Sequence, residues 1–379
     1  MKKTTQVLIL LCISFSGFYC AKKNTNPVGV EYYANSGIGS EQFITLYSLS
    51  SDTTYKSDAS LADSPYMYIG HQQDLSAEAY LRFPTISDTG QIDSAKILLH
   101  VVDFIGDESA SGQMVVHKVL QEWDEDTERN NFSSAMSGEI LATINPVDTL
   151  LDSIFISIPL DLLSLWQDTT SGYNYGIHLS MDDDILLKLY AYESASSTVG
   201  IPQLWLYFHE DSTRSPEIIT YAQDVTVASS SFEPASDRLT VENGIAIRSL
   251  MKFNLDSIPQ NAAINLATLT LFADSLLTIP SASTTGLYVY NLTDEEPWTF
   301  QDMAFDSTYG ASGTLSDYQA DIDMTTLLQL LVSDYIEYHG LVLKGGNENS
   351  LLSKTTFFST QADSAVQPRL QVYFTLPPR

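Results

Sequence analysis

The residues best suited to chemistry in this chain lie in two acidic segments, each of which contains a tryptophan. The segments are EWDED (122–126) and TDEEPW (293–298), and each follows a short alternating strand pattern. An aromatic ring can stack on a sugar ring, and adjacent carboxylates can bond sugar hydroxyls or hold Ca²⁺. In the competing interpretation, each tryptophan plugs the end of a folded domain while its acidic neighbours stay in water. The candidate residues are Trp123, Asp124, Asp126, Asp294, Glu295 and Trp298.

Two pairs of aromatic residues at alternate positions form a second set of binding candidates. Side chains two residues apart on a strand share a face. Trp205 and Tyr207 are therefore predicted to lie side by side on the face opposite two leucines. Tyr288 and Tyr290 form a similar pair in the second half of the chain. Such a pair can serve as a stacking platform for a pyranose ring or as a contact with a neighbouring domain.

The sequence contains no recognisable catalytic motif. It lacks the G-x-S-x-G, H-E-x-x-H, P-loop and dinucleotide-binding glycine patterns. Its six histidines occur singly, and His100, His117 and His178 lie in strand patterns, where packing or surface placement is their ordinary role. With 47 acidic residues, a glycosidase-like pair of carboxylates will arise by chance. The sequence therefore predicts a protein that is not an enzyme and needs no cofactor, with Ca²⁺ binding as an alternative.

The charge balance excludes one class of partner. The 18 Lys and Arg residues stand against 47 Asp and Glu residues, which gives a formal net charge of −29. Such a surface repels DNA, RNA and anionic lipid headgroups. No nucleic-acid partner is expected, and the excess acid favours solubility outside the cytoplasm over cation binding.

The first twenty residues have the layout of an export signal. Two lysines precede an apolar run over 7–18, which is too short to span a bilayer as a mature helix. The run ends at Cys20, in a layout that resembles a bacterial lipoprotein signal, although Tyr19 is larger than the usual preceding residue. Ordinary signal-peptidase cleavage after Ser16 is the alternative. The predicted location is the bacterial cell envelope, outer membrane or cell surface, with membrane contact through a lipid on Cys20 alone.

The second half of the chain repeats the first. Pro202 of GIPQLWLYF corresponds to Pro368 of VQPRLQVYF, and NYGIHL (174–179) corresponds to YHGLVL (338–343). A shared order of segments indicates a duplication, which predicts two domains. The predicted boundaries are a signal peptide over 1–20, a polar tether over 21–40, a first domain over 41–210, a linker over 211–217 and a second domain over 218–376.

Short alternating strands separated by turn residues make up most of both halves. In ATLTLFAD (267–274), for example, leucines alternate with threonines, which is typical of a half-buried strand. One segment per half, LDLLSLWQD (160–168) and DMTTLLQLLVSD (323–334), has the apolar spacing of a short helix. The predicted fold class is therefore all-β, with two tandem antiparallel jelly-roll-like β-sandwiches that each carry one short helix.

Several of these segments together resemble the DNRLRE domain, a β-sandwich module of secreted and surface proteins. In the second half the resemblance depends on SLMKFNLDSIPQNAAINLATLTLF (249–272), HGLVLKG (339–345) and QPRLQVYF (367–374). The first half matches more loosely, through YLRF (80–83) and ESASSTVGIPQLWLYF (193–208). The matching residues are mainly core and turn residues, so the resemblance implies the fold. Part of the family is classed among carbohydrate-binding modules, which makes polysaccharide the leading ligand class.

Together these patterns predict an exported, lipid-anchored envelope protein with two non-catalytic binding modules. The expected partner is a polysaccharide or another cell-surface component. One alternative is a structural or adhesive surface protein whose sandwiches act as spacers or protein contacts. Another is a carbohydrate-active hydrolase or lyase with its site between the domains.

Overall fold

The fold of this chain is almost entirely antiparallel β-sheet. The computed structural model describes residues 40–48, 53–57, 59–86, 90–106, 112–125, 131–133, 136–145, 152–168, 170, 173–182, 184–194, 200–208, 215–233, 235, 237–279, 285–295 and 303–377. Two eleven-stranded sheets and two short helices account for the regular structure of these residues. The predicted all-β class, with two antiparallel sandwiches and one short helix in each, is confirmed.

Each half contributes eleven strands and one helix among the described residues, in the same order along the chain. The first half contains β1 (Ser40–Tyr47), β2 (Thr53–Lys56), β3 (Tyr66–Gln72), β4 (Leu75–Arg82), β5 (Ile92–Gly106), β6 (Met114–Val119), β7 (Ser137–Ile144), β8 (Ser153–Ile158), α3 (Leu160–Gln167), β9 (Ile177–Met181), β10 (Ile185–Tyr190) and β11 (Gln203–Phe208). The second half contains β12 (Glu217–Ile219), β13 (Gln223–Ser230), β14 (Arg238–Asn243), β15 (Ile247–Met251), β16 (Ala263–Phe272), β17 (Gly286–Leu292), β18 (Phe305–Ser316), β19 (Gln319–Asp323), α4 (Thr325–Val332), β20 (Leu341–Gly345), β21 (Ser353–Phe358) and β22 (Arg369–Leu376).

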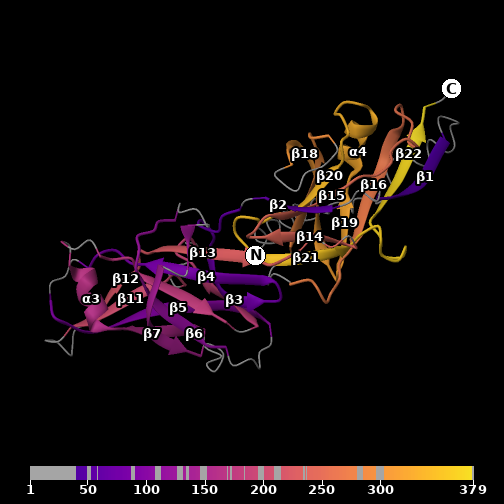
Figure 1. Ribbon diagram of the computed structural model, residues 1–379. Coiled ribbons are helices and arrows are strands. Elements are labelled where there is room, and N and C mark those ends of the chain that lie inside the picture. The colour runs from indigo at the N-terminus through magenta and orange to yellow at the C-terminus, as the bar shows by residue number, and fades with distance from the viewer. Residues whose placement is uncertain are drawn as a thin grey trace, which may run out of the picture.

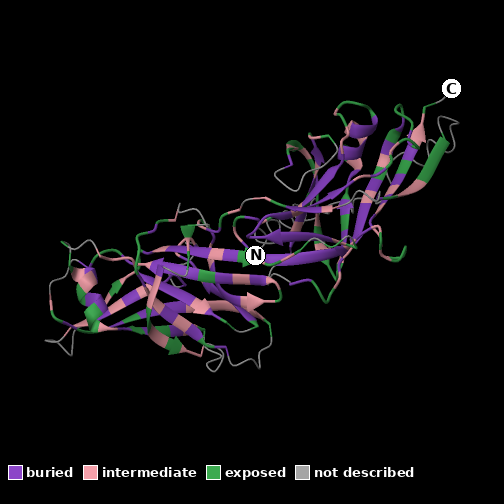
Figure 2. Ribbon diagram, viewed as in Figure 1, coloured by how far each residue is buried: buried purple, intermediate pink, exposed green. Residues whose placement is uncertain are grey.

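Each eleven-stranded sheet folds back on itself into two facing layers. In the first sandwich, the long strand β5 pairs with β8 and β11 in one layer and with β10 in the other. In the second, β18 pairs with β17 over most of its length and with β19 at its end. Buried and exposed residues alternate along many of the strands, as Figure 2 shows. The apolar sides of the two layers therefore face each other.

The first two strands of each half lie in the sandwich of the other half. β1 pairs with β22 along its full length and β2 pairs with β15, so both complete the second sandwich. β12 pairs with β11 and β13 pairs with β4, so both complete the first sandwich. Figure 1 shows the indigo strands β1 and β2 among the orange and yellow strands of the second half. The two halves thus exchange their opening strands.

This exchange departs from the domain boundaries predicted from the sequence, which follow the repeats. The first sandwich consists of β3 to β13, and the second consists of β1, β2 and β14 to β22. The sequence repeats therefore divide the chain between β11 and β12, whereas the packed sandwiches divide it after β2 and after β13. The short connection between β11 and β12 favours the exchange, because consecutive strands joined by short connections usually pair with each other.

Each sandwich has its own apolar core, and the exchanged strands take part in it. Ile219 of β12 packs against the first core, where α3 buries Trp166. Ile44 and Leu46 of β1 pack against the second core, where α4 buries Leu328. The donated strands therefore supply apolar contacts as well as backbone hydrogen bonds, and each sandwich is incomplete without them.

A smaller apolar cluster with charged groups beside it joins the two sandwiches. The cluster includes Tyr68 from the first sandwich and Ile245 from the second. Lys354 donates to both carboxylate oxygens of Asp74, at 2.6 and 2.7 Å, across the same junction. The chain also passes between the sandwiches twice, after β2 and after β13. Two covalent connections and a packed interface thus hold the sandwiches together.

Glu242 of β14 lies at this junction and is fully buried, with 0% of its surface exposed. The Ser230 hydroxyl donates to its Oε1 atom at 3.3 Å, and Oε2 has no hydrogen-bond partner among the described residues. Burial raises the pKa of Glu242 to about 7, the Asp74 carboxylate adds to the rise, and Lys354 opposes it. The folded state therefore favours the protonated form of this carboxyl.

We expect Glu242→Gln to stabilise the protein at pH 8 and to change its stability little at pH 4. The pKa of Glu242 is raised from 4.5 to about 7 on folding, so the folded state binds more protons and stability falls as the pH rises through this range. Glutamine cannot ionise, and one pKa unit corresponds to about 1.4 kcal/mol, so the gain at pH 8 should be on the order of 3 kcal/mol. Urea unfolding at both pH values measures it, with the exposed Glu233→Gln as the control. Equal effects at pH 4 and pH 8 would contradict the prediction.

Removal of the chain through residue 57 should loosen the second sandwich and leave the first one folded. The second sandwich would lose β1 and β2, whereas every strand of the first lies between β3 and β13. Hydrogen-exchange mass spectrometry should show lost protection in β22 and β15, the partners of the missing strands. Protection in β4 and β11 should not change. Lost protection in β4 and β11 instead would show that each half keeps its own opening strands.

Candidate functional site

A groove crosses the outer face of one layer of the first sandwich. Two adjoining hollows, of about 680 Å³ and about 450 Å³, form this groove. The hollows share Glu78 and Ser180, and together they extend from β3 and β4 across β9 to β6 and β7. Volumes of this size are typical of sites for small molecules.

The groove lies where the sheet divides beside β4. β13 pairs with β4 over its whole length, so β3 and β9 must share the opposite edge of β4. β3 pairs with residues 75–77 of β4 and β9 pairs with residues 79–81. The two strands diverge next to Glu78, and residues of both line the larger hollow. The concavity is therefore a consequence of strand pairing.

Polar side chains line the groove because strand alternation directs them outward. Glu78 of β4 and Ser180 of β9 each lie between two buried apolar neighbours, so their side chains point away from the core. His117 of β6 and Val227 of β13 extend the same surface into the smaller hollow. Val227 belongs to the second half of the chain, so the strand exchange supplies part of the wall.

Three polar side chains at the smaller hollow form a continuous hydrogen-bonded chain. The Nε2 atom of His178 lies 3.0 Å from Oε2 of Glu78. The Nδ1 atom of His178 lies 2.7 Å from Oγ of Ser137. The hydrogen bond to His178 lowers the pKa of Glu78, so this carboxylate is ionised at neutral pH and only accepts. A neutral His178 therefore carries its proton on Nε2, and its Nδ1 accepts the proton of the Ser137 hydroxyl.

Two rings hold the imidazole of His178 in place. Tyr80 stacks on it with ring centroids 4.5 Å apart, and His117 stacks at 5.5 Å. Because β9 lies between β4 and β6, the two rings flank His178 on opposite sides. Burial raises the pKa of Tyr80 to about 12, the Glu78 carboxylate adds to the rise, and a hydrogen bond with Ser137 opposes it. The Tyr80 hydroxyl thus stays neutral and contacts Ser137.

Sequence patterns give no sign that these residues meet. Ser137 and Glu78 lie 41 and 100 positions from His178 in the chain, so no local motif contains them. The interpretation of His178 as a packing or surface residue is incomplete, because the residue is 4% exposed and its ring is hydrogen-bonded at both nitrogens. The available signal is that Glu78 and His178 each lie between buried apolar residues of their strands, whereas Ser137 is the first residue of β7 and gives no such signal. The register that brings them together is visible only in the folded sheet.

Trp123 is buried, contrary to the hypothesis that it presents a ring to a sugar. The residue is 2% exposed, and its Nε1 atom donates to the Tyr175 carbonyl at 2.8 Å. The guanidinium group of Arg82 lies 5.2 Å from the ring centroid. Its acidic neighbour Asp124 is exposed. Trp123 therefore belongs to a small apolar cluster with Tyr80 and cannot stack on a ligand.

Trp205 and Tyr207 share the outer face of β11, as predicted. The two leucines that alternate with them are fully buried, and both aromatic side chains are half-buried. Trp205 meets Phe155 edge to face with centroids 6.2 Å apart. Phe155 is 50% exposed, so these rings form an aromatic patch on the layer of the first sandwich opposite the groove.

Tyr288 and Tyr290 also share one face of their strand, as predicted. Their ring planes are parallel to within 1° and the centroids lie 6.0 Å apart. Tyr290 continues the row by stacking on Phe305 at 5.3 Å, and the guanidinium of Arg248 lies 5.4 Å from the Phe305 centroid. Tyr288 is the most open of the rings at 39% exposed. The second sandwich therefore carries an aromatic row on its outer face.

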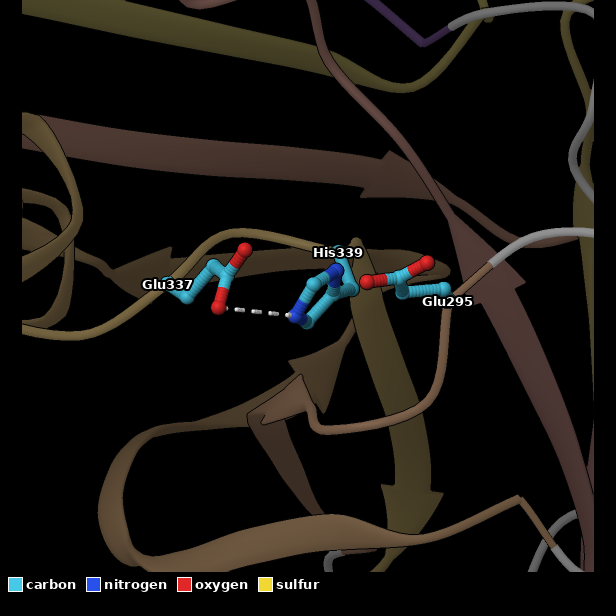
Figure 3. A group of neighbouring side chains, drawn as sticks. All are labelled: Glu295, Glu337 and His339. Carbon is cyan, nitrogen blue, oxygen red and sulfur yellow. Dashed lines mark ion pairs between the residues drawn. The ribbon is translucent and has the colours of Figure 1, made fainter.

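Glu295, Glu337 and His339 form the one group of neighbouring metal-ligand side chains within the part of the chain that the structure describes (Figure 3). Their ligand atoms lie within 4.8 Å of one another, and Glu337 pairs with His339 at 3.7 Å. Two carboxylates and an imidazole suit Zn²⁺ better than Ca²⁺, which prefers a larger set of oxygen ligands. Asp294, the other candidate in this loop, instead accepts the backbone N–H of Ala304 at 2.7 Å.

Three predicted functional residues lie outside the described residues: Cys20, Asp126 and Trp298. The predicted signal peptide over 1–20 and most of the tether over 21–40 lie outside them as well. Their roles therefore stay predictions. Within the described residues, no helix has the length and apolar character that crossing a membrane requires.

No protein-family profile and no curated protein sequence matches this chain. The resemblance to the DNRLRE domain therefore depends on the quoted sequence segments alone.

We expect Trp123→Ala to destabilise the protein far more than Trp205→Ala. Loss of the buried Trp123 ring should lower the free energy of unfolding by about 3–5 kcal/mol, as is typical of core aromatic residues. Trp205 is half-buried on an outer face, so its loss should cost at most about 1.5 kcal/mol. Urea unfolding of the two variants measures the difference. Equal losses would contradict the burial that distinguishes the two rings.

Proposed function

We propose that this protein binds a polysaccharide in the groove of the first sandwich, at the bacterial cell envelope. The observation that carries the proposal is the pair of adjoining hollows on one sheet face, lined largely by polar side chains. Because the strands of a packed sandwich hold these side chains, the groove is formed before a ligand arrives. A preformed site loses less conformational entropy on binding.

The side chains of the groove have the chemistry that sugar recognition requires. Glu78 and Asp182 offer carboxylate acceptors, and the Ser180 hydroxyl can donate or accept. Phe132 lines the smaller hollow and supplies an aromatic surface for a ring face. Two hollows in line suit consecutive units of one chain. This combination favours a hydroxyl-rich ligand over a purely apolar one.

The charge of the protein narrows the ligand class further. The formal net charge is −29, and the larger hollow contains two carboxylates, Glu78 and Asp182. A polyanionic glycan would be repelled at long range and in the groove. We therefore expect a neutral polysaccharide, or one that carries cationic groups.

The exchanged strands would also place the groove far from a membrane anchor. A lipid on Cys20 would attach through the tether to β1, which belongs to the second sandwich. Figure 1 shows β1 beside β22 at the end of the second sandwich that points away from the first. In a lipid-anchored protein the second sandwich would then be the stalk, and the first sandwich, with its groove, would face outward.

A protein-contact role is the second candidate function, favoured by an exposed apolar row on the second sandwich. Phe43, Tyr373 and Leu266 lie at one register level of three adjacent strands. They are 52%, 46% and 42% exposed, and the rings of Phe43 and Tyr373 lie 4.5 Å apart. An apolar surface of this kind also suits contact with another protein.

Affinity gel electrophoresis of the mature protein through neutral polysaccharides tests the proposal. At least one polysaccharide should retard the protein, and Ser180→Leu should weaken the retardation about tenfold or more, because leucine fills the groove where its hollows meet. The control is Ser157→Leu, the same change at an exposed position of β8 on the opposite layer. Retention unchanged by Ser180→Leu would contradict groove binding, and retention lost in Trp205→Ala would assign it to the aromatic patch.

A further inference from the structure

We propose that Ser137 is a nucleophile that hydrolyses acyl esters, with His178 as its general base and Glu78 as the residue that positions the base. The substrate class we infer is an acyl ester on a hydroxyl of a glycan in the groove. That substrate class depends on the proposed function, whereas the reactivity of Ser137 does not. No local motif predicts this activity, because β4, β7 and β9 each contribute one of the three residues.

The hydrogen-bond directions are those that an activated serine needs. A serine hydroxyl is a weak nucleophile until a base within hydrogen-bond reach removes its proton. Oγ of Ser137 and Nδ1 of His178 lie 2.7 Å apart. In the neutral imidazole the ring proton is on Nε2, where Glu78 accepts it, so Nδ1 carries no proton and the hydrogen bond to Ser137 uses the hydroxyl proton. The lone pair of Nδ1 therefore points at the proton that must leave. Tyr80 also bonds to Ser137 and helps to fix the direction of its hydroxyl.

An irregularity in the sheet explains how Ser137 reaches an imidazole two strands away. β7 lies beyond β6 from β9, and the register between β6 and β7 shifts on both sides of His117. Such β-bulges redirect side chains. Gly138 follows the nucleophile directly, and a Cβ atom there would come within 2.8 Å of the Leu120 side chain. Ser137 and Gly138 both line the smaller hollow.

The reaction follows from this arrangement in two balanced steps. In the first, Oγ of Ser137 bonds to the acyl carbon, its proton moves to Nδ1 of His178, and the departing sugar oxygen takes that proton as its bond to the acyl carbon breaks. In the second, water gives a proton to Nδ1 and bonds to the acyl carbon. The Ser137 oxygen then leaves and regains the proton. The products are a carboxylic acid and a free sugar hydroxyl.

Glu78 stabilises the positive charge that His178 carries between these proton transfers. Its Oε2 atom lies 3.0 Å from Nε2, and its side chain is 52% exposed, whereas that of His178 is 5% exposed. The carboxylate thus faces the groove while the base is shielded. Ser133 and Ser180 also line the hollows, but among the described residues Ser137 is the serine whose hydroxyl meets an imidazole nitrogen.

A fluorophosphonate probe and p-nitrophenyl acetate test the proposal on the mature protein. The probe should attach once per chain, and peptide mass mapping should place it on Ser137. Ester hydrolysis should fall roughly 100-fold or more in Ser137→Ala and in His178→Gln, as expected for loss of nucleophile or base. Ser157→Ala is the matched control, because it removes an exposed hydroxyl of β8 on the opposite layer of the same sandwich, and it should retain labelling and hydrolysis.

Glu78→Gln separates positioning from a structural role. The variant should lower kcat for the ester and leave KM unchanged, and Glu78→Asp should restore part of the rate. A change in KM alone would overturn the role given to Glu78.

Neither probe contains a sugar, so the result is independent of polysaccharide binding. Absence of labelling in a protein that unfolds cooperatively would overturn the proposal, as would labelling that persists in Ser137→Ala. Polysaccharide retention by an unlabelled protein would preserve the binding function without the hydrolysis. Labelling without retention would support the nucleophile and remove the glycan as the carrier of the ester.

Discussion

The structure depends on the reciprocal exchange of opening strands between the two halves of the chain. β1 and β2 pair with the second sandwich while β12 and β13 pair with the first, and both sets pack against the recipient core. Each sandwich therefore needs residues from both halves. The exchange also carries the chain twice across the junction, where Lys354 and Asp74 pair beside an apolar cluster. A duplicated sequence has thus become one interlocked body.

The groove is a consequence of the same exchange. β13 occupies one edge of β4 completely, which leaves β3 and β9 to divide the other edge and to diverge beside Glu78. Val227 of β13 lies opposite Glu78 in the ladder and lines the smaller hollow. A first sandwich with an unpaired β4 edge would lose this wall. The groove therefore exists only because the second half of the chain donates β13 to the first sandwich.

The fold class could be predicted from the sequence because strand alternation and a duplication are local or periodic signals. The same signals correctly placed Trp205 and Tyr207 on one face of β11. Long-range pairing decides which strand edge β1 or β12 joins, and the repeat pattern carries no information about it. The domain boundaries predicted from the sequence therefore follow the repeats and not the sandwiches. The site cannot be predicted from the sequence for a related reason. Ser137, His178 and Glu78 meet through register across β4, β9, β6 and β7, and no spacing within a single segment encodes that register.

The two sandwiches differ in the side chains on the face where the first one carries the groove. In the first sandwich, His117 of β6 lies opposite His178 of β9. At the corresponding place in the second sandwich, Tyr290 of β17 lies opposite Val342 of β20. Val342 is fully buried, and Tyr290 stacks between Tyr288 and Phe305. The face that holds a polar hollow in one copy is therefore covered by aromatic rings in the other. Because the two sandwiches share a backbone arrangement, a few side chains decide whether this face holds a polar hollow or a row of aromatic rings. After the duplication, the second sandwich pairs with the N-terminal strand β1, and the first sandwich keeps the open site.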